Sequence, residues 1–152
     1  MLTTMMKFPI TLVILFGIKM TVFNIIGLSY FVEIPKKEGL SVGVFLLGAV
    51  VILVAGYSFK KANTTVNPAT PELTSSLVTV GVFSLSRNPM YVGFLLFVTS
   101  FFIVSENLLN VVFIPLFIFM ANRLYIMPEE TALGEIFGND FERYKARVRR
   151  WL

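Results

Sequence analysis

The chain has 152 residues, of which 56% are hydrophobic, and its mean hydropathy of +0.80 is well above that of soluble globular proteins. It contains no cysteine and no histidine, which excludes disulfide bonds, thiol nucleophiles, haem held by these residues and zinc sites of the usual nitrogen–sulfur type. The formal net charge is +4, and the distribution of the charges is more informative than their sum. These values predict an all-α integral membrane protein with a single domain, residues 1–152.

Four apolar segments predict about four transmembrane helices, at residues 8–32, 40–59, 89–104 and 108–127. Lys19 lies near the middle of the first segment, where a charge is costly in lipid, so we expect it to snorkel or to face a neighbouring helix. In the second segment, Gly48, Ala55 and Gly56 fall near one face, which a second helix could approach closely.

The connection at residues 60–88 is too long for a simple hairpin, and connections of this length are usually functional or disordered. Its apolar part, residues 77–85, is too short to cross a bilayer and is expected to lie at the interface or to re-enter it. A tight turn at residues 105–107 makes the third and fourth predicted spans an antiparallel hairpin.

Residues 128–152 predict surface helices after the last span. Pro128 followed by two acids is typical of a new helix start. Residues 138–140 indicate a stop and a fresh N-cap, with Glu142 at a capping-box position. Apolar residues recur every three or four positions, which predicts an amphipathic segment lying along the membrane: Leu133, Ile136, Phe137, Phe141, Tyr144, Val148 and Trp151.

The basic residues predict the orientation. With four spans, both termini and the connection at 60–88 share one side of the membrane, and the positive-inside rule makes that side cytoplasmic. It holds nine bases against two on the other side, Lys36 and Lys37. The nine are Lys7, Lys60, Lys61, Arg87, Arg143, Lys145, Arg147, Arg149 and Arg150.

Residues 86–93, with the sequence Ser-Arg-Asn-Pro-Met-Tyr-Val-Gly, are hard to explain as packing alone. Arg87 carries five fixed donors that suit a carboxylate or a phosphate. Pro89 fits the first turn of a helix, and Tyr91 and Gly93 would then lie in that turn beside backbone N–H groups without intrahelical partners. The stretch therefore predicts an anion-receptive helix start at the membrane surface.

Taken together, residues 77–79 with Gly81, residues 87–93, the pair Glu129-Glu130, and Phe137-Gly138 with Tyr144 and Val148 resemble the isoprenylcysteine carboxyl methyltransferase family. This family belongs with the phospholipid methyltransferases, membrane enzymes that use S-adenosylmethionine. The resemblance runs from about residue 60 to residue 152, and the first two spans match only in being apolar. It implies a catalytic role for Arg87 and a cofactor site formed by Gly81, Arg87, Asn88, Pro89, Tyr91, Gly93, Glu129 and Glu130.

The chemistry of these side chains agrees with that cofactor. Glu129 or Glu130 could pair with its ammonium, and Arg87 or free helix-start N–H groups could take its carboxylate. Tyr91 could place an aromatic face or its hydroxyl near the sulfonium. The family usually has His where this chain has Asn88, and an Asn can form hydrogen bonds but cannot shuttle protons.

Methyl transfer is an in-line displacement that chiefly requires positioning in a dry site, and it needs no general base when the acceptor is already an anion. The expected acceptor is lipid-borne or apolar: a prenylated cysteine carboxylate, a phospholipid headgroup or a small apolar molecule. Membrane lipids are the other expected partners, and neither nucleic acid nor a metal is expected.

Two other functions stay open at this point. Sterol reductases that use NADPH share an Arg-His-Pro-x-Tyr pattern, but the acidic pair argues against them because a 2′-phosphate requires bases nearby. A non-enzymatic membrane scaffold with the same fold is the third possibility.

Overall fold

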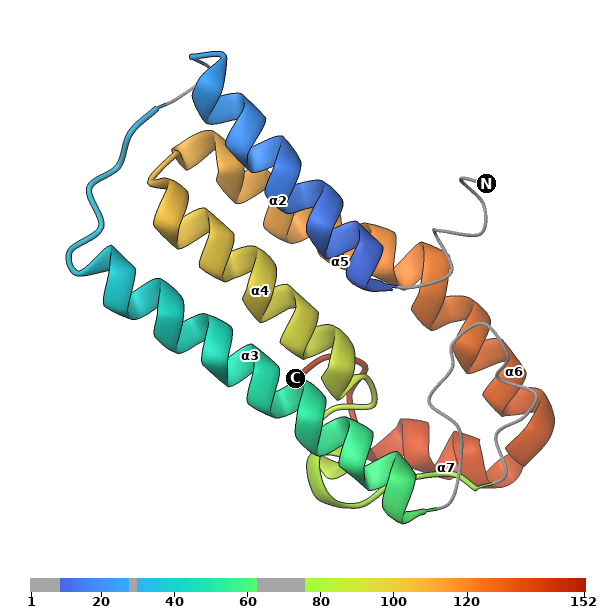
Figure 1. Cartoon of the computed structure of the whole chain (residues 1–152). Helices are drawn as coiled ribbons and strands as arrows, with labels where there is room; N and C mark the ends of the chain where they lie inside the picture. The colour runs from blue at the N-terminus through green and yellow to red at the C-terminus, as the bar shows by residue number, and fades with distance from the viewer. Residues whose placement is uncertain (1–8, 28–29, 63–75) are drawn as a thin grey trace.

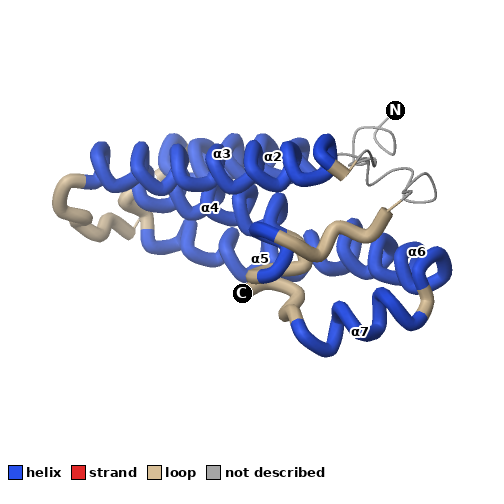
Figure 2. Tube along the Cα trace, turned by 90° about the horizontal axis from the view of Figure 1, so that it is seen from below, coloured by secondary structure: helices blue, strands red, loops and turns tan. Residues whose placement is uncertain are grey.

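The computed structural model describes residues 9–27, 30–62 and 76–152. Its helices are α2 (Pro9–Ile25), α3 (Lys37–Lys61), η2 (Gly81–Ser84), α4 (Pro89–Ser105), η3 (Leu108–Val112), α5 (Phe113–Ala121), η4 (Asn122–Ile126), α6 (Met127–Phe137) and α7 (Asn139–Arg147). Figure 1 shows α4 between α2 and α3, with the run from η3 to α6 forming one long rod. The turned view in Figure 2 shows α7 standing off from the bundle near α6. Within the described ranges there is no named strand, and an isolated antiparallel bridge joins Phe31 to Asn107.

Two helices are long and apolar enough to cross a membrane, Lys37–Lys61 and Leu108–Phe137. The other two long helices, α2 and α4, are also apolar and have 17 residues each. The fold is therefore the membrane-type all-α fold that the sequence predicts, whereas the number of four spans and their orientation stay predictions. The start of the first predicted span and residues 63–75 of the long connection lie outside the described residues.

The core lies where α2, α4 and α5 meet. Phe16 of α2 is buried against Phe113 and Phe117 of the long rod, with ring centroids 5.2 Å and 6.3 Å away. The other members of this cluster come from all three helices and from η4: Leu12, Val13, Met20, Tyr91, Phe94, Val98, Ala121, Tyr125 and Ile126. By contrast, α3 exposes large apolar side chains along most of its length, as a lipid-facing helix does.

Helices α3 and α4 touch through two glycines. A Cβ atom at Gly93 would lie 2.5 Å from Cγ1 of Ile52 and 2.7 Å from the backbone oxygen of Gly48. The predicted close approach at Gly48 is confirmed, and Ala55 is fully buried, but Gly56 faces open space. Gly93 lies one turn beyond the helix start rather than within the first turn, and helix packing accounts for it.

Replacing Gly93 by Ala is expected to lower the free energy of unfolding by about 1–3 kcal/mol, because the added methyl group meets backbone as well as side-chain atoms. The matched control is Gly43→Ala on α3, where an added Cβ meets nothing within 4 Å. The control should be neutral or slightly stabilising, since Ala is the better helix former. Denaturant unfolding of both variants in detergent tests this, and equal stabilities would contradict the packing role.

The prediction of a new helix start at Pro128 is wrong. The π-helical turn η4 joins α5 to α6 without a break, and the shifted hydrogen-bond register accommodates a proline that has no N–H to donate. The continuous helix has 30 residues, about 45 Å at 1.5 Å per residue, so its end projects beyond a hydrocarbon layer of about 30 Å. The acidic pair therefore continues the last span rather than opening a separate surface helix.

The predicted break at Gly138 is confirmed, because this residue has a φ of 48° and α7 begins directly after it. The predicted capping box is wrong. No side chain caps the start of α7, and Glu142 pairs with Lys145 instead, with 2.9 Å between Oε1 and Nζ. The reason is local, since Lys145 lies one turn along the same exposed face.

At the opposite end of the bundle, buried amides hold the turn that was predicted at residues 105–107. The Asn107 side chain accepts hydrogen bonds from the backbone N–H groups of Tyr30 and Leu109, at 3.2 Å and 3.1 Å, and donates to Asn24 at 2.7 Å. Glu106 pairs with Lys37 at the start of α3. These contacts tie the segment before α3 to the turn between α4 and η3.

Candidate active site

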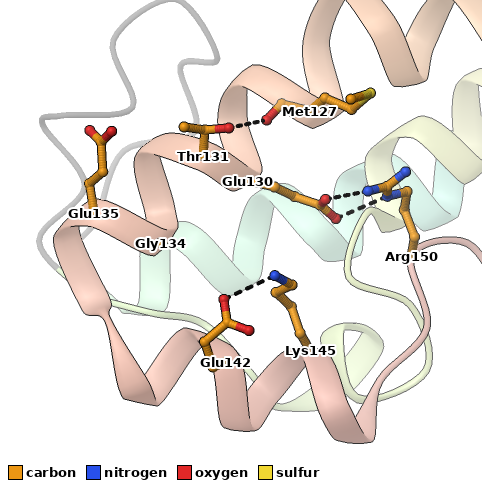
Figure 3. A pocket seen from close by; sticks show the side chains of 8 residues that line it. All are labelled: Met127, Glu130, Thr131, Gly134, Glu135, Glu142, Lys145 and Arg150. Carbon is orange, nitrogen blue, oxygen red and sulfur yellow. Dashed lines mark hydrogen bonds and ion pairs between the residues drawn. The ribbon is translucent and has the colours of Figure 1, made fainter.

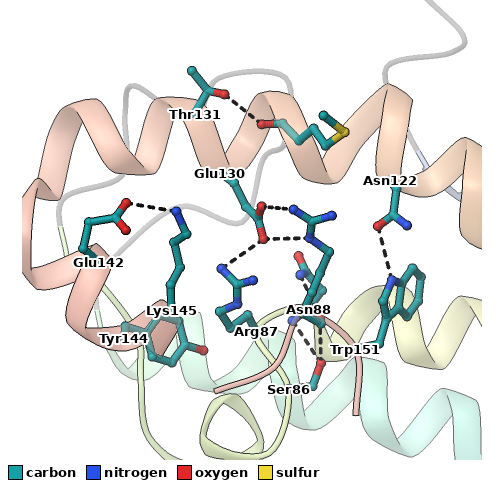
Figure 4. A network of polar contacts seen from close by, with 12 residues as sticks. Ser86, Arg87, Asn88, Asn122, Glu130, Thr131, Glu142, Tyr144, Lys145 and Trp151 are labelled. Atoms are coloured by element: carbon teal, nitrogen blue, oxygen red, sulfur yellow. Dashed lines mark hydrogen bonds and ion pairs between the residues drawn. The ribbon is translucent and has the colours of Figure 1, made fainter. Parts of the chain in front are cut away.

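The motif before α4 is covered by the last five residues of the chain, which we call the C-terminal strap (residues 148–152). The backbone N–H of Arg87 donates to the carbonyl of Arg149 at 2.9 Å. The side chains of Asn88 and Ser86 donate to the carbonyl of Arg150 at 3.0 Å and 3.3 Å. The start of α4 is at Pro89, as predicted, but the strap encloses the loop that leads into it (Figure 4).

One carboxylate joins the motif, the strap and α6. Glu130 lies between two guanidinium groups (Figure 4): Oε1 is 3.1 Å from Nη1 of Arg87, and Arg150 donates to both oxygens at 3.1 Å and 2.5 Å. The side chains of Arg87 and Glu130 are only 11% and 13% exposed, and that of Arg150 is 36% exposed. The hydrogen bonds to Glu130 raise the pKa of Arg150, so this guanidinium stays charged.

Arg87 keeps unused donors inside the protein. Its Nε and Nη1 atoms are buried and have no hydrogen-bond partner in the part of the chain that the structure describes. Nη1 is close enough to Glu130 for an ion pair but is not aligned with it for a hydrogen bond. A buried donor without a partner is costly, so these N–H groups suit an acceptor group from a ligand.

Glu129, the other acid of the pair, is not balanced by a described cation as Glu130 is. Glu129 accepts a hydrogen bond of 3.4 Å from the Tyr91 hydroxyl, and no described basic side chain forms an ion pair with it. The ring of Tyr91 lies 6.1 Å from that of Tyr125, centroid to centroid, and both tyrosines are buried. A carboxylate that forms no ion pair with a described base, next to two phenol rings, suits a positively charged group.

A pocket of about 410 Å³ opens between α6 and α7, with Glu130 and Arg150 in its wall (Figure 3). Its other lining residues are Met127, Thr131, Gly134, Glu135, Glu142 and Lys145. Because Glu130 also contacts Arg87, the pocket and the buried motif share this carboxylate.

Helix α7 is fixed under the site by its aromatic residues. Phe141 is buried, and the Tyr144 hydroxyl donates to the carbonyl of Phe83 in η2 at 2.7 Å. Burial raises the pKa of Tyr144 to about 12, which keeps this donor protonated at neutral pH. Tyr144 of the predicted amphipathic stripe thus docks against η2, whereas Ile136 of the stripe is exposed.

Of the predicted site residues, the structure brings together Arg87, Asn88, Pro89, Tyr91, Glu129 and Glu130. Gly81 opens η2 on the exposed surface, where its φ of 66° favours glycine, and Gly93 faces α3. Lys19 is exposed on α2, and Arg123 is exposed with its guanidinium 6.0 Å from the Phe119 ring, so neither lies in this cluster.

Sequence reasoning missed the strap and η4. The sequence indicates only that Arg150 is one of the nine bases on the cytoplasmic side, although its carbonyl and guanidinium bind the motif and Glu130. The Trp151 indole donates to Asn122 in η4 at 3.2 Å and packs against the core. The signal that could have revealed the strap is Trp151, the single tryptophan of the chain.

The sequence model of the family described as phospholipid methyltransferase matches residues 37–140, about two thirds of the chain. The chain belongs to this family. A protein of Haemophilus influenzae named only as an uncharacterized protein is 38% identical over 63 residues, which are 41% of this chain and the whole of that protein. No solved structure matches the chain.

Membership of the phospholipid methyltransferase family confirms the kinship inferred from the motifs and makes the protein a membrane methyltransferase in general terms. The matched region contains the motif at residues 86–93 and the acidic pair, and it ends at the start of α7. The strap of this phospholipid methyltransferase family member therefore lies outside the shared region.

Proposed function

We propose that this protein transfers a methyl group from S-adenosylmethionine to a lipid-borne or apolar acceptor, at the cytoplasmic side of the membrane. One observation carries the proposal. A guanidinium with buried donors, Arg87, contacts Glu130, and the next carboxylate along the chain, Glu129, accepts from Tyr91 and forms no ion pair with a described base. An amino-acid end with a carboxylate and an ammonium fits this pair of groups in charge and in hydrogen-bonding capacity.

The different contacts of Glu129 and Glu130 support different roles for the two acids. Glu130 is neutralised by Arg87 and Arg150, whereas Glu129 has the Tyr91 hydroxyl as its hydrogen-bond partner. We therefore assign the cofactor's ammonium to Glu129 and its carboxylate to the unpartnered donors of Arg87, and Glu130 holds Arg87 in place. The cofactor, when bound, supplies a methyl group on a positively charged sulfur.

The remaining residues position the reaction and keep it dry. The Tyr91 hydroxyl orients the carboxylate of Glu129, and the strap covers the backbone before Pro89. The Asn88 amide donates to the carbonyl of Arg150, so its role is to hold the strap rather than to move protons.

The absence of histidine favours an acceptor that is already a nucleophile, such as a carboxylate on a lipid-like molecule. An isoprenylcysteine-like acceptor fits this chemistry, and entry from the bilayer between helices fits its apolar character. The cytoplasmic placement rests on the nine bases at the motif side of the predicted topology. The family match supports a methyltransferase, and none of the comparisons supports the NADPH-dependent reductase.

Thermal unfolding of the detergent-solubilised protein tests the proposal. S-Adenosylhomocysteine at about 100 times its dissociation constant should stabilise the folded protein by roughly 2.7 kcal/mol, and NADPH should not stabilise it. Glu129→Gln should remove most of this gain, while Glu38→Gln, an exposed residue at the far end of α3, should leave it intact.

A gain with NADPH alone would move the protein to the reductases. A folded protein that responds to neither ligand would favour the scaffold.

A further inference from the structure

We propose that Tyr125, which lies outside the motif, forms with Tyr91 an aromatic wall that recognises the positive charge of the methyl donor and thereby sets the preference for the donor over the demethylated product. This inference rests on the proposed function and names a specificity-determining residue in the same site.

The position of Tyr125 depends on η4. This π-helical turn lies between the apolar α5 and the acid-bearing α6, and it directs Tyr125 into the core beside Tyr91. The two rings are 6.1 Å apart with 36° between their planes, so they form a bent surface rather than a stack. Turns of this type are frequent at functional sites.

The surroundings of this wall are electron-rich. The Tyr91 hydroxyl donates a hydrogen bond to Glu129, and Glu130 follows directly in sequence. Arg87 and Arg150, the described bases that contact the acidic pair, are both held by Glu130, and the guanidinium of Arg123 lies 6.0 Å from the Phe119 ring. A cation against the ring faces would be attracted by the ring quadrupoles and by the carboxylate of Glu129.

The donor and its product differ in charge at this point. In the transfer, the bond between the methyl carbon and the sulfur breaks while the acceptor forms a new bond to the carbon. The bonding electron pair stays on the sulfur, so a sulfonium becomes a neutral thioether. An aromatic wall stabilises the first and not the second, whereas the amino-acid ends of both molecules are identical. The wall therefore discriminates by charge alone and favours release of the product.

Direct binding measurements on the full-length protein in detergent test this assignment. The ligands are S-adenosylmethionine, sinefungin, which carries an ammonium near the position of the sulfonium, and the neutral S-adenosylhomocysteine. The unmodified protein should bind the charged ligands more tightly. Tyr125→Phe should keep this preference, and Tyr125→Leu should reduce it by about 10-fold with little change in the affinity for S-adenosylhomocysteine. Tyr57→Leu, an exposed residue on α3, is the control and should change nothing.

The outcomes distinguish a failure of the proposed function from a failure of the role assigned to Tyr125. If the unmodified protein binds none of the three ligands, the proposed function fails. If it binds them without a charge preference, or if Tyr125→Leu weakens all of them equally, the function stands and Tyr125 is a packing residue. Should Tyr125→Leu lose the cooperative unfolding transition, stepwise fluorinated phenylalanines at position 125 keep the shape of the ring. The preference should then fall with each fluorine, and a constant preference would overturn the inference.

Discussion

Replacing Glu130 by Gln is expected to lower the free energy of unfolding by about 3–5 kcal/mol, because it leaves the buried guanidinium of Arg87 without a counter-charge. Arg150 loses the same partner, but it is more exposed and recovers part of its hydration. Urea or SDS unfolding in detergent measures the change.

The matched control for this substitution is Glu142→Gln in α7. Glu142 also pairs with a basic side chain, Lys145, but it is 61% exposed, and such surface pairs contribute about 0–1 kcal/mol. Similar losses in the two variants would show that Glu130 does not organise the site.

Ending the chain after Val148 is expected to weaken binding of S-adenosylhomocysteine by at least about 100-fold while the apolar helices still insert. The truncation removes the carbonyl groups that accept from Arg87, Asn88 and Ser86, and each lost buried hydrogen bond costs on the order of 1 kcal/mol. It also removes the bidentate partner of Glu130. Ligand affinity and membrane extraction are measured in parallel.

A milder variant isolates one contact of the strap. Trp151→Phe keeps an aromatic ring against the core and loses the hydrogen bond to Asn122, so its affinity should fall far less than that of the truncated chain. Full affinity in the truncated chain would reduce the strap to a lipid anchor.

Local sequence rules predicted the helices well where one residue type dominates the choice. Pro89 marks the start of α4, Gly138 ends α6, and Gly48 lies in a helix contact. Each of these positions is decided by the conformation of the local backbone or by the space beside it, which the residue type alone indicates. The same rules failed at Pro128, since a π-helical turn has no periodicity of its own and a proline after it resembles a helix start.

The candidate site was only partly visible in the sequence. The pattern of Arg87, Tyr91 and the acidic pair was sufficient to predict that these residues meet. It could not show which acid is already neutralised, because that depends on Arg150, 20 residues further along. Nor could it place the strap, whose contacts with residues 86–88 join positions more than 60 apart.

The π-helical turn also limits how the length of this chain can change. Between Ala121 and Met127 the helix makes its turn with one residue more than an α-helix would use. Deleting a single residue there would restore a regular α-helix and leave the turns on either side in phase, because the π-helical turn holds its extra residue within one turn. Glu129 and Glu130 would keep their direction toward Tyr91 and Arg87, but the proline before them would enter an α-helical register, in which its ring meets the carbonyl group four residues earlier. Inserting a residue into the regular part of the rod would instead rotate the acidic pair by about 100° about the helix axis. The loss of the wide turn is therefore expected to disturb the helix at Pro128, and a gain in length is expected to separate the acidic pair from Tyr91 and Arg87.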